Sequence, residues 1–174
     1  MNKTARYLIY IVILPAVIVL LDQWTKSWVR ANLAMGETYM PWKWLEPYAT
    51  ITHWYNRGVA FGMFQGGGTI FILLPIIIML GIIIYFSKVE TRSWLVDLAL
   101  SFELGGALGN FIDRVRLGHV TDFIAVGKFP VFNVADSFVT VGVVLLILGV
   151  WLEDKREKQA ALAEKPIESP ANTE

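Results

Sequence analysis

Two aspartates in the last third of the chain are the residues best suited to chemistry. Asp122 lies in the segment Val120-Thr121-Asp122-Phe123, and Asp136 lies in Asn133-Val134-Ala135-Asp136-Ser137. Two carboxyl groups held close together can share one proton, because like charges push one of the two pKa values up. One aspartate can then activate water as a base, while the protonated one polarises a carbonyl and protonates the leaving amine. The pair is therefore a candidate dyad for hydrolysis of an amide bond.

Both aspartates also have a purely structural explanation. Asn133 can be the N-cap of the last apolar helix, with Asp136 at the third helical position as in a capping box, where the helix dipole favours an acid. Asp122 can be a turn residue between two apolar segments. These alternatives stay open beside the catalytic interpretation.

A polar face on the stretch before Asp122 is a second signal. Glu103, Asn110 and the pair Asp113-Arg114 are separated by seven and then by three or four residues, so they lie on nearly one helix face. An ionised group at mid-bilayer costs about 2.5 to 3.5 kcal/mol, so this face should point into a helix bundle. Asp113 and Arg114 can be a structural pair, but Asp113 is also the closest rival for the catalytic role. The sequence indicates no role for Glu103.

Two spacings predict close contacts around this face. Asp22 and Lys26, with Gln23 beside them, are four residues apart and can form an ion pair on one helix face; the alternative is a solvated helix end with an interfacial lysine. Gly105 and Gly109 form a small-xxx-small ridge, which lets another helix pack closely.

The segment Asn56-Arg57-Gly58-Val59-Ala60-Phe61-Gly62 is a weaker signal. Its two glycines bracket small and aromatic residues, so its backbone can approach a ligand or a neighbouring segment closely. A tight hairpin without a ligand explains the same pattern.

Other catalytic patterns are poorly matched. The chain has no His-Glu-x-x-His helix, no Gly-x-Ser-x-Gly elbow and no cysteine, which excludes a thiol nucleophile and a disulfide. His53 and His119 could complete a three-ligand metal site with Asp122, although two unconnected histidines in loops are more often ordinary polar residues.

The composition places these groups in a membrane protein. Hydrophobic residues make up 55% of the 174 residues, charged residues only 17%, and the mean hydropathy is +0.52. Fifteen basic and fifteen acidic residues cancel, which leaves no basic field to recruit nucleic acid. The apolar runs predict four spans, at about 7–28, 69–86, 94–112 and 136–152. The first run resembles a signal peptide, but no small-x-small cleavage pattern follows it.

The segments outside the spans have different characters. The loop of about 31–68 mixes aromatic and β-branched residues, which predicts an aromatic belt, a short interfacial sheet, or both. Residues 153–174 form a charged, Ala-rich and then Pro-containing tail, for which we expect a frayed helix and then disorder. An even number of spans puts both termini on one side, and eight basic residues on that side against seven opposite barely decide the orientation.

Five motifs in order along most of the chain resemble those of the lipoprotein signal peptidases, also called signal peptidase II, which are bacterial membrane aspartic peptidases. The motifs are Asp22-Gln23-x-x-Lys26, Asn56-x-Gly58-x-Ala60-Phe61, Gly105-Gly106-Ala107-x-Gly109-Asn110-x-x-Asp113-Arg114, Val120-x-Asp122-Phe123 and Phe132-Asn133-x-Ala135-Asp136-Ser137. Each is weak alone, and their joint order is specific.

The resemblance implies an integral membrane, mainly α fold: a four-transmembrane-helix bundle, residues 1–152, with a small extracytoplasmic β-rich cradle and cytoplasmic termini. The catalytic dyad maps onto Asp122 and Asp136. Positions expected to support the site or to bind substrate are Asn133, Asn110, Arg114, Asp113, Asp22, Gln23, Lys26, Asn56, Gly58, Ala60, Phe61 and Ala135.

The implied substrate is a prolipoprotein whose signal peptide is removed before a diacylglyceryl-modified cysteine at the bacterial inner membrane. No cofactor and no metal is expected, and we expect a monomer in contact with membrane lipids. Without the resemblance, a small transporter or proton-relay protein is the best alternative, since intramembrane acids also mark ion paths. A membrane scaffold would explain the glycine ridge but not the aspartates.

Overall fold

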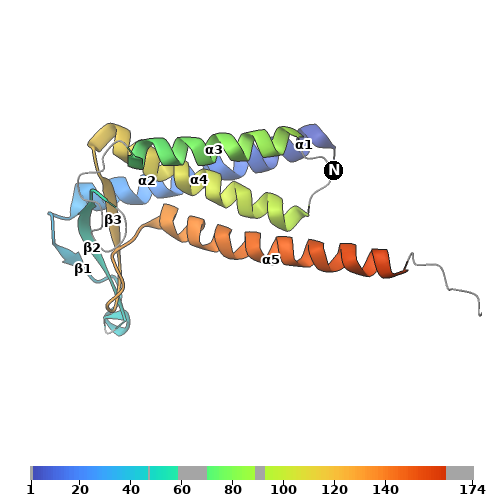
Figure 1. Ribbon diagram of the computed structural model, residues 1–174. Helices are drawn as coiled ribbons and strands as arrows, with labels where there is room; N and C mark the ends of the chain where they lie inside the picture. Colours follow the sequence, from blue (N-terminus) through green and yellow to red (C-terminus); the bar gives the residue numbers. More distant parts are fainter. Residues whose placement is uncertain (1, 47, 59–69, 89–92, 164–174) are drawn as a thin grey trace, which may run out of the picture.

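The computed structural model describes residues 2–46, 48–58, 70–88 and 93–163. Long apolar helices lie side by side, and a small sheet stands at the end of the bundle away from the N-terminus and from the end of α5 (Figure 1). The expected positions Ala60 and Phe61 fall outside the described residues.

In the described part of the chain, four helical segments make up the bundle. The first is continuous through α1 (Lys3–Tyr7), a π-helical turn η1 (Leu8–Ile13) and α2 (Leu14–Asn32); the others are α3 (Ile70–Lys88), α4 (Trp94–Leu117) and α5 (Val134–Ala163). Helices suit these runs because a backbone in lipid must satisfy its hydrogen bonds internally. Among the described residues, three stretches are long and apolar enough to cross a membrane, namely Lys3–Asn32, Trp94–Leu117 and Val134–Leu162.

Polar residues and glycine define the helix ends. The Ser93 hydroxyl accepts a hydrogen bond from the backbone N–H of Leu95 at the start of α4. Gly118 ends α4 in the left-handed region, at φ 74°, and its N–H donates to the Arg114 carbonyl. The last turn of α4 therefore places Arg114 just before the chain turns into the sheet.

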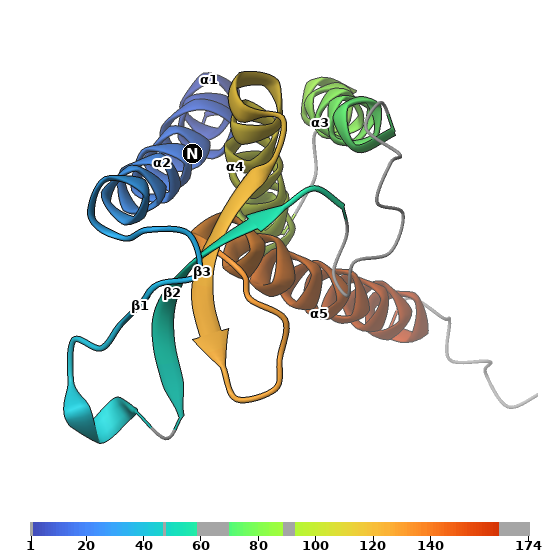
Figure 2. The same cartoon turned by 90° about the vertical axis from the view of Figure 1, so that its left-hand side faces the viewer.

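Helix α4 lies at the centre of the bundle and contacts α2, α3 and α5 (Figure 2). A Cβ atom at Gly105 would lie 2.8 Å from the Ile18 side chain, and one at Gly109 would lie 2.7 Å from Oδ2 of Asp22. A Cβ atom at Gly106 would lie 2.6 Å from the Ala135 carbonyl oxygen. The close packing predicted for the glycine ridge is therefore confirmed, against α2 and α5 together.

The sheet is antiparallel, with the order β1-β2-β3. Strands β1 (Thr38–Tyr39) and β2 (Ala49–Asn56) fall inside the loop where a short sheet was expected. Strand β3 (Val120–Val126) comes from the segment after α4, and Asp122 on it pairs in register with Trp54. The interpretation of Asp122 as a turn residue is therefore wrong, because this β-branched and aromatic segment finds its partner in β2.

The polar segment after Leu152 begins as a helix. Helix α5 continues to Ala163, so the first eleven residues of that segment are helical. They are rich in Ala, Lys, Glu and Gln, which favour helix, and Lys158 pairs with Asp154 one turn earlier.

The Gly106 contact gives a test of the helix packing. We expect Gly106→Ala to cost about 1–3 kcal/mol, because the new methyl group would clash with backbone oxygen and with Val139. The measurement is the apparent unfolding temperature in detergent, which should fall by several degrees. The control is Gly81→Ala in α3, where the described residues place no atom within 4 Å of the added Cβ apart from the adjoining backbone of α3, and its unfolding temperature should not fall. Equal temperatures for the two variants would contradict the packing described here.

Candidate active site

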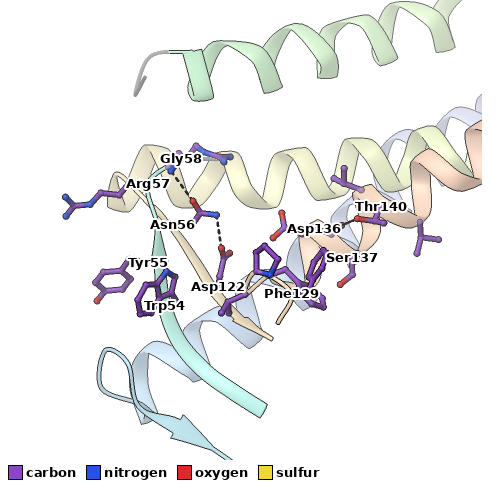
Figure 3. A pocket seen from close by; sticks show the side chains of 16 residues that line it. Trp54, Tyr55, Asn56, Arg57, Gly58, Asp122, Phe129, Asp136, Ser137 and Thr140 are labelled. Atoms are coloured by element: carbon purple, nitrogen blue, oxygen red, sulfur yellow. Dashed lines mark hydrogen bonds between the residues drawn. The ribbon is translucent and has the colours of Figure 1, made fainter. Parts of the chain in front are cut away.

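Asp122 and Asp136 line one cavity of about 730 Å³ at the sheet end of the bundle. Asp122 reaches it from β3 and Asp136 from the first turn of α5 (Figure 3). The walls are largely aromatic and aliphatic, with Trp54 from β2, Phe129 from the segment before α5 and Val139 from α5. The two carboxyl groups are thus polar groups in a mostly apolar recess, the usual composition of a small-ligand or peptide site.

Two asparagine side chains hold the Asp122 carboxyl group. Its Oδ2 accepts from Asn56 Nδ2 at 2.9 Å, and its Oδ1 accepts from Asn133 Nδ2 at 2.7 Å. The side chain is only 1% exposed. Burial, followed by the charge of Asp136, raises the pKa of Asp122 from 3.8 to about 7. This group therefore exchanges its proton near neutral pH.

Asp136 is held by the start of its own helix and by α4. Its Oδ2 accepts from the backbone N–H of Asn133 at 3.2 Å, while Oδ1 of Asn133 accepts from the backbone N–H of Asp136 at 2.9 Å. The capping box predicted from the spacing is confirmed. The other oxygen, Oδ1, accepts from Asn110 Nδ2 at 2.7 Å. The hydrogen bonds that cap α5 therefore also hold the Asp136 carboxyl group in the site.

The two asparagines Asn110 and Asn133 also connect the carboxyl groups to each other. Asn133 Nδ2 donates to Asn110 Oδ1 at 3.1 Å as well as to Asp122. The chain Asp122–Asn133–Asn110–Asp136 is continuous, and both amides are buried. Rotation of the Asn110 amide would break its contacts to Asp136 and Asn133, and rotation of the Asn133 amide would break its contacts to Asp122 and Asn110, so these amides restrict the relative orientation of the two carboxyl groups.

A buried charge cluster, formed by Asp22, Lys26 and Asp113, lies behind the amides. Lys26 Nζ is 2.8 Å from Asp22 Oδ2 and 3.5 Å from Asp113 Oδ2, and it donates to Asn110 Oδ1 at 2.9 Å. Asp22 and Lys26 are 0% exposed. The predicted ion pair is confirmed, and the alternative of a solvated helix end is wrong.

Both aspartates of the cluster also bind backbone groups of other elements. Asp22 Oδ1 accepts from the N–H of Ala135 at the start of α5, and Asp113 Oδ2 accepts from the N–H of Thr121 on β3, both at 3.0 Å. Gln23 Nε2 donates to both acids. Each of the two aspartates therefore fixes the residue next to a candidate catalytic aspartate.

Asp113 and its neighbour Arg114 point in different directions. Within the described part of the chain, the ion pairs of Asp113 are with Lys26 and with Arg30, at 3.7 Å, and not with Arg114. Arg114 lines the cavity, whereas Asp113 is 1% exposed and does not. The interpretation of the two as a structural pair is wrong, because adjacent helical residues face about 100° apart.

The glycine and alanine positions have local roles. The N–H of Gly58 donates to Asn56 Oδ1 at 3.0 Å, which directs the Asn56 amide nitrogen toward Asp122. Ala135 is fully buried, and its Cβ would lie 3.3 Å from a Cβ at Gly109. A larger side chain at position 135 would separate α5 from α4.

The two histidines do not meet at Asp122. His53 Nδ1 is hydrogen-bonded to the Leu33 carbonyl at 2.8 Å, and the rings of His53 and His119 both contact Tyr55. Burial lowers the pKa of His119. Among the described residues, no three histidine or acidic side chains are grouped as metal ligands.

Two features were not predicted from the sequence. Arg30 donates to the Thr121 hydroxyl at 3.0 Å and extends the charge cluster; its spacing of four from Lys26 was the available signal. Phe129 and Phe132 form an edge-to-face pair, with ring centroids 5.8 Å apart, in the cavity wall. No spacing in the sequence indicates that contact.

Comparison with known proteins gives a consistent result. Residues 14–152 match a family model described as signal peptidase (SPase) II. The chain is 40% identical over 150 residues to a lipoprotein signal peptidase of Anoxybacillus flavithermus, covering 84% of this chain and 88% of the relative. A second, from Geobacillus thermodenitrificans, is 42% identical over 150 residues, covering 84% and 92%.

A solved structure is also similar. It is described as a bacterial membrane enzyme determined by the in meso method at 2.3 Å resolution, and it superposes with a TM-score of 0.78 at 34% identity. The match covers 90% of this chain and 93% of the solved chain. The arrangement of helices and sheet is therefore shared over nearly the whole length.

The raised pKa of Asp122 predicts a pH-dependent stability. The ordinary pKa is 3.8 and the folded value about 7, so the folded state binds the proton more tightly and ionisation destabilises it, by at most about 4 kcal/mol above pH 7. Asp122→Asn removes the ionisation, but it also sets an NH2 group against the Nδ2 of Asn56 or Asn133, a loss that does not depend on pH. The unfolding temperature of the variant relative to wild type should therefore be several degrees higher at pH 8 than at pH 4. Asp154→Asn, at an exposed site, is the control; a difference from wild type that does not change with pH would contradict this account.

Proposed function

The chain belongs to the signal peptidase II family of membrane peptidases, and on that basis we propose that it is an aspartic endopeptidase whose catalytic dyad is Asp122 and Asp136. The observation that carries the proposal is the connected pair of carboxyl groups in one cavity, held by shared amides, with a pKa near 7 for Asp122. Such a pair retains one proton over a range around neutral pH, as an acid–base dyad requires.

The proposed reaction is the addition of water to the peptide carbonyl. The ionised aspartate takes a proton from water as the water oxygen bonds to the carbonyl carbon. At the same time the protonated aspartate donates its proton to the carbonyl oxygen. The tetrahedral intermediate then loses the amine as the C–N bond breaks: the protonated aspartate gives its proton to the nitrogen, and the ionised aspartate takes a proton from one hydroxyl group of the intermediate. The products are a carboxylic acid and an amine, and the dyad again holds one proton.

The proposed substrate is a prolipoprotein, cleaved before its diacylglyceryl-modified cysteine. The curated relatives are named lipoprotein signal peptidases, and the shape of the cavity is consistent with such a substrate. Beyond the carboxyl groups the cavity reaches Thr140 and Val141, which lie on exposed turns of apolar α5. Acyl chains can therefore remain in lipid while the peptide lies at the dyad.

The proposed topology has four spans, with α3 as the fourth, and a monomeric protein in the bacterial inner membrane. Helix α3 has 19 residues, with its single charge at Lys88. Both termini, and the polar segment from residue 153, would be cytoplasmic, which puts the sheet and the cavity at the extracytoplasmic face. The separation of the sheet from the end of α5 along the bundle supports this arrangement (Figure 1).

The direct test is cleavage of a synthetic diacylglyceryl-modified prolipoprotein by the purified protein. Asp122→Asn and Asp136→Asn should each lower the rate by about 10²–10⁴-fold or more, because acid–base catalysis contributes that much. Asp113→Asn should weaken cleavage less, since Asp113 does not line the cavity.

Asp154→Asn serves as the matched surface control and should leave the rate unchanged. Each variant is first shown to be folded by its unfolding transition. Full activity of Asp122→Asn or Asp136→Asn would overturn the dyad, and no cleavage by folded wild type would favour a transporter or proton-relay protein.

A dyad that acts on water directly predicts that cleavage does not depend on a metal ion. Activity should survive prolonged incubation with a strong chelator, followed by assay in chelator-containing buffer. A zinc-dependent peptidase treated in parallel shows that the treatment strips metal. Loss of activity that zinc restores would instead support a metal site at His53 and His119.

A further inference from the structure

Lys26 brings a positive charge close to both candidate catalytic carboxyl groups without touching either. Its side chain is 0% exposed, and Nζ donates to Asn110 Oδ1 at 2.9 Å. A charge away from water acts more strongly on its neighbours than a solvated one, because little dielectric screening intervenes.

A single amide joins Lys26 to Asp136. The oxygen of Asn110 accepts from the ammonium group, and Nδ2 of the same amide donates to Asp136 Oδ1 at 2.7 Å. A cation at the oxygen end polarises the amide and makes its N–H a stronger donor. A stronger donor favours the ionised form of the carboxyl group that accepts from it.

A second hydrogen-bond chain connects the same Asn110 oxygen to Asp122. Asn110 Oδ1 also accepts from Asn133 Nδ2, which donates to Asp122 Oδ1 at 2.7 Å. The Asn110 amide, to which the ammonium group donates, is therefore the branch point of two hydrogen-bond chains, one to each aspartate.

The neighbouring anions oppose this effect. Asp22 and Asp113 face Lys26 from α2 and α4, and Arg30 lies against Asp113. On the cavity side, Arg114 faces the two carboxyl groups, and Arg57 is the other basic residue in the lining formed by the described residues. The electrostatic potential at the dyad therefore depends on opposing charges: Lys26 favours the ionised form of the carboxyl groups, and Asp22 disfavours it.

We propose that Lys26 is a positioning residue that sets, through Asn110, the pH range in which the two carboxyl groups hold one proton between them, and that Asp22 opposes it. This inference rests on the proposed peptidase function. It assigns Lys26 an electrostatic task beyond its structural contacts, so removal of its charge should move the pH dependence of the reaction as well as its rate.

The test is the pH profile of kcat/KM for cleavage of the diacylglyceryl-modified substrate. In Lys26→Met both the acidic and the alkaline limb should move to higher pH by about 1 unit, the lower end of what a nearby charge does to a carboxyl group. In Asp22→Asn both limbs should move to lower pH. The opposite directions separate electrostatics from damage to the fold, which lowers the rate without moving the limbs.

Lys158→Met is the matched control. Lys158 pairs with Asp154 at the same i,i+4 spacing as Lys26 with Asp22, but on an exposed helix surface. Its profile should match that of wild type. If Lys26→Met does not fold, the double variant Asp22→Asn/Lys26→Met, which loses both partners, should give limbs above those of Asp22→Asn.

The inference is overturned if the limbs of folded Lys26→Met stay in place, or if Asp22→Asn moves them upward. It is also overturned if the double variant and Asp22→Asn have the same limbs. A wild-type protein that cleaves no substrate at any pH would contradict the proposed function instead, so the two failures are distinguishable.

Discussion

The burial of three charged side chains, Asp22, Lys26 and Asp113, is the constraint on which the rest of this structure depends. Charges removed from water are tolerated only when the remaining hydrogen-bonding capacity of each group is filled. Here the filling partners are backbone N–H groups of Thr121 and Ala135, which belong to different elements. Satisfying the charges therefore ties α2 and α4 to β3 and to α5.

This constraint explains why the candidate dyad is assembled from distant segments. Thr121 precedes Asp122 by one residue and Ala135 precedes Asp136 by one residue. Anchoring a backbone group so close to each carboxyl group leaves little freedom in the position of either. The glycines of α4 complete the arrangement, because they let the anchored segments approach its axis closely.

The structural and functional interpretations of Asn133 and Asp136 are compatible in the folded protein. A capping box needs an amide and an acid three residues apart, and the acid keeps one oxygen for Asn110. The hydrogen bonds of the cap satisfy backbone groups at the helix start that need partners in any case. The orientation of Asp136 is thus obtained from the local geometry of α5.

Local patterns in the sequence determined the helices of this protein and several contacts within them. Apolar runs specified the helices, because lipid forces each segment to satisfy its own backbone, and the spacings of three and four predicted the capping box and the Asp22–Lys26 pair. The ordered motifs predicted the family, which the comparisons confirm.

Contacts between distant segments were decided only by the tertiary structure. Strand β3 was missed because its partner β2 lies about 70 residues away, and the partner of Asp113 was misassigned because it comes from α2. Such contacts depend on which faces meet across the bundle, and no short spacing in the sequence records that. The joining of Lys26 to both carboxyl groups through Asn110 belongs to the same class, since it requires four separate segments to converge.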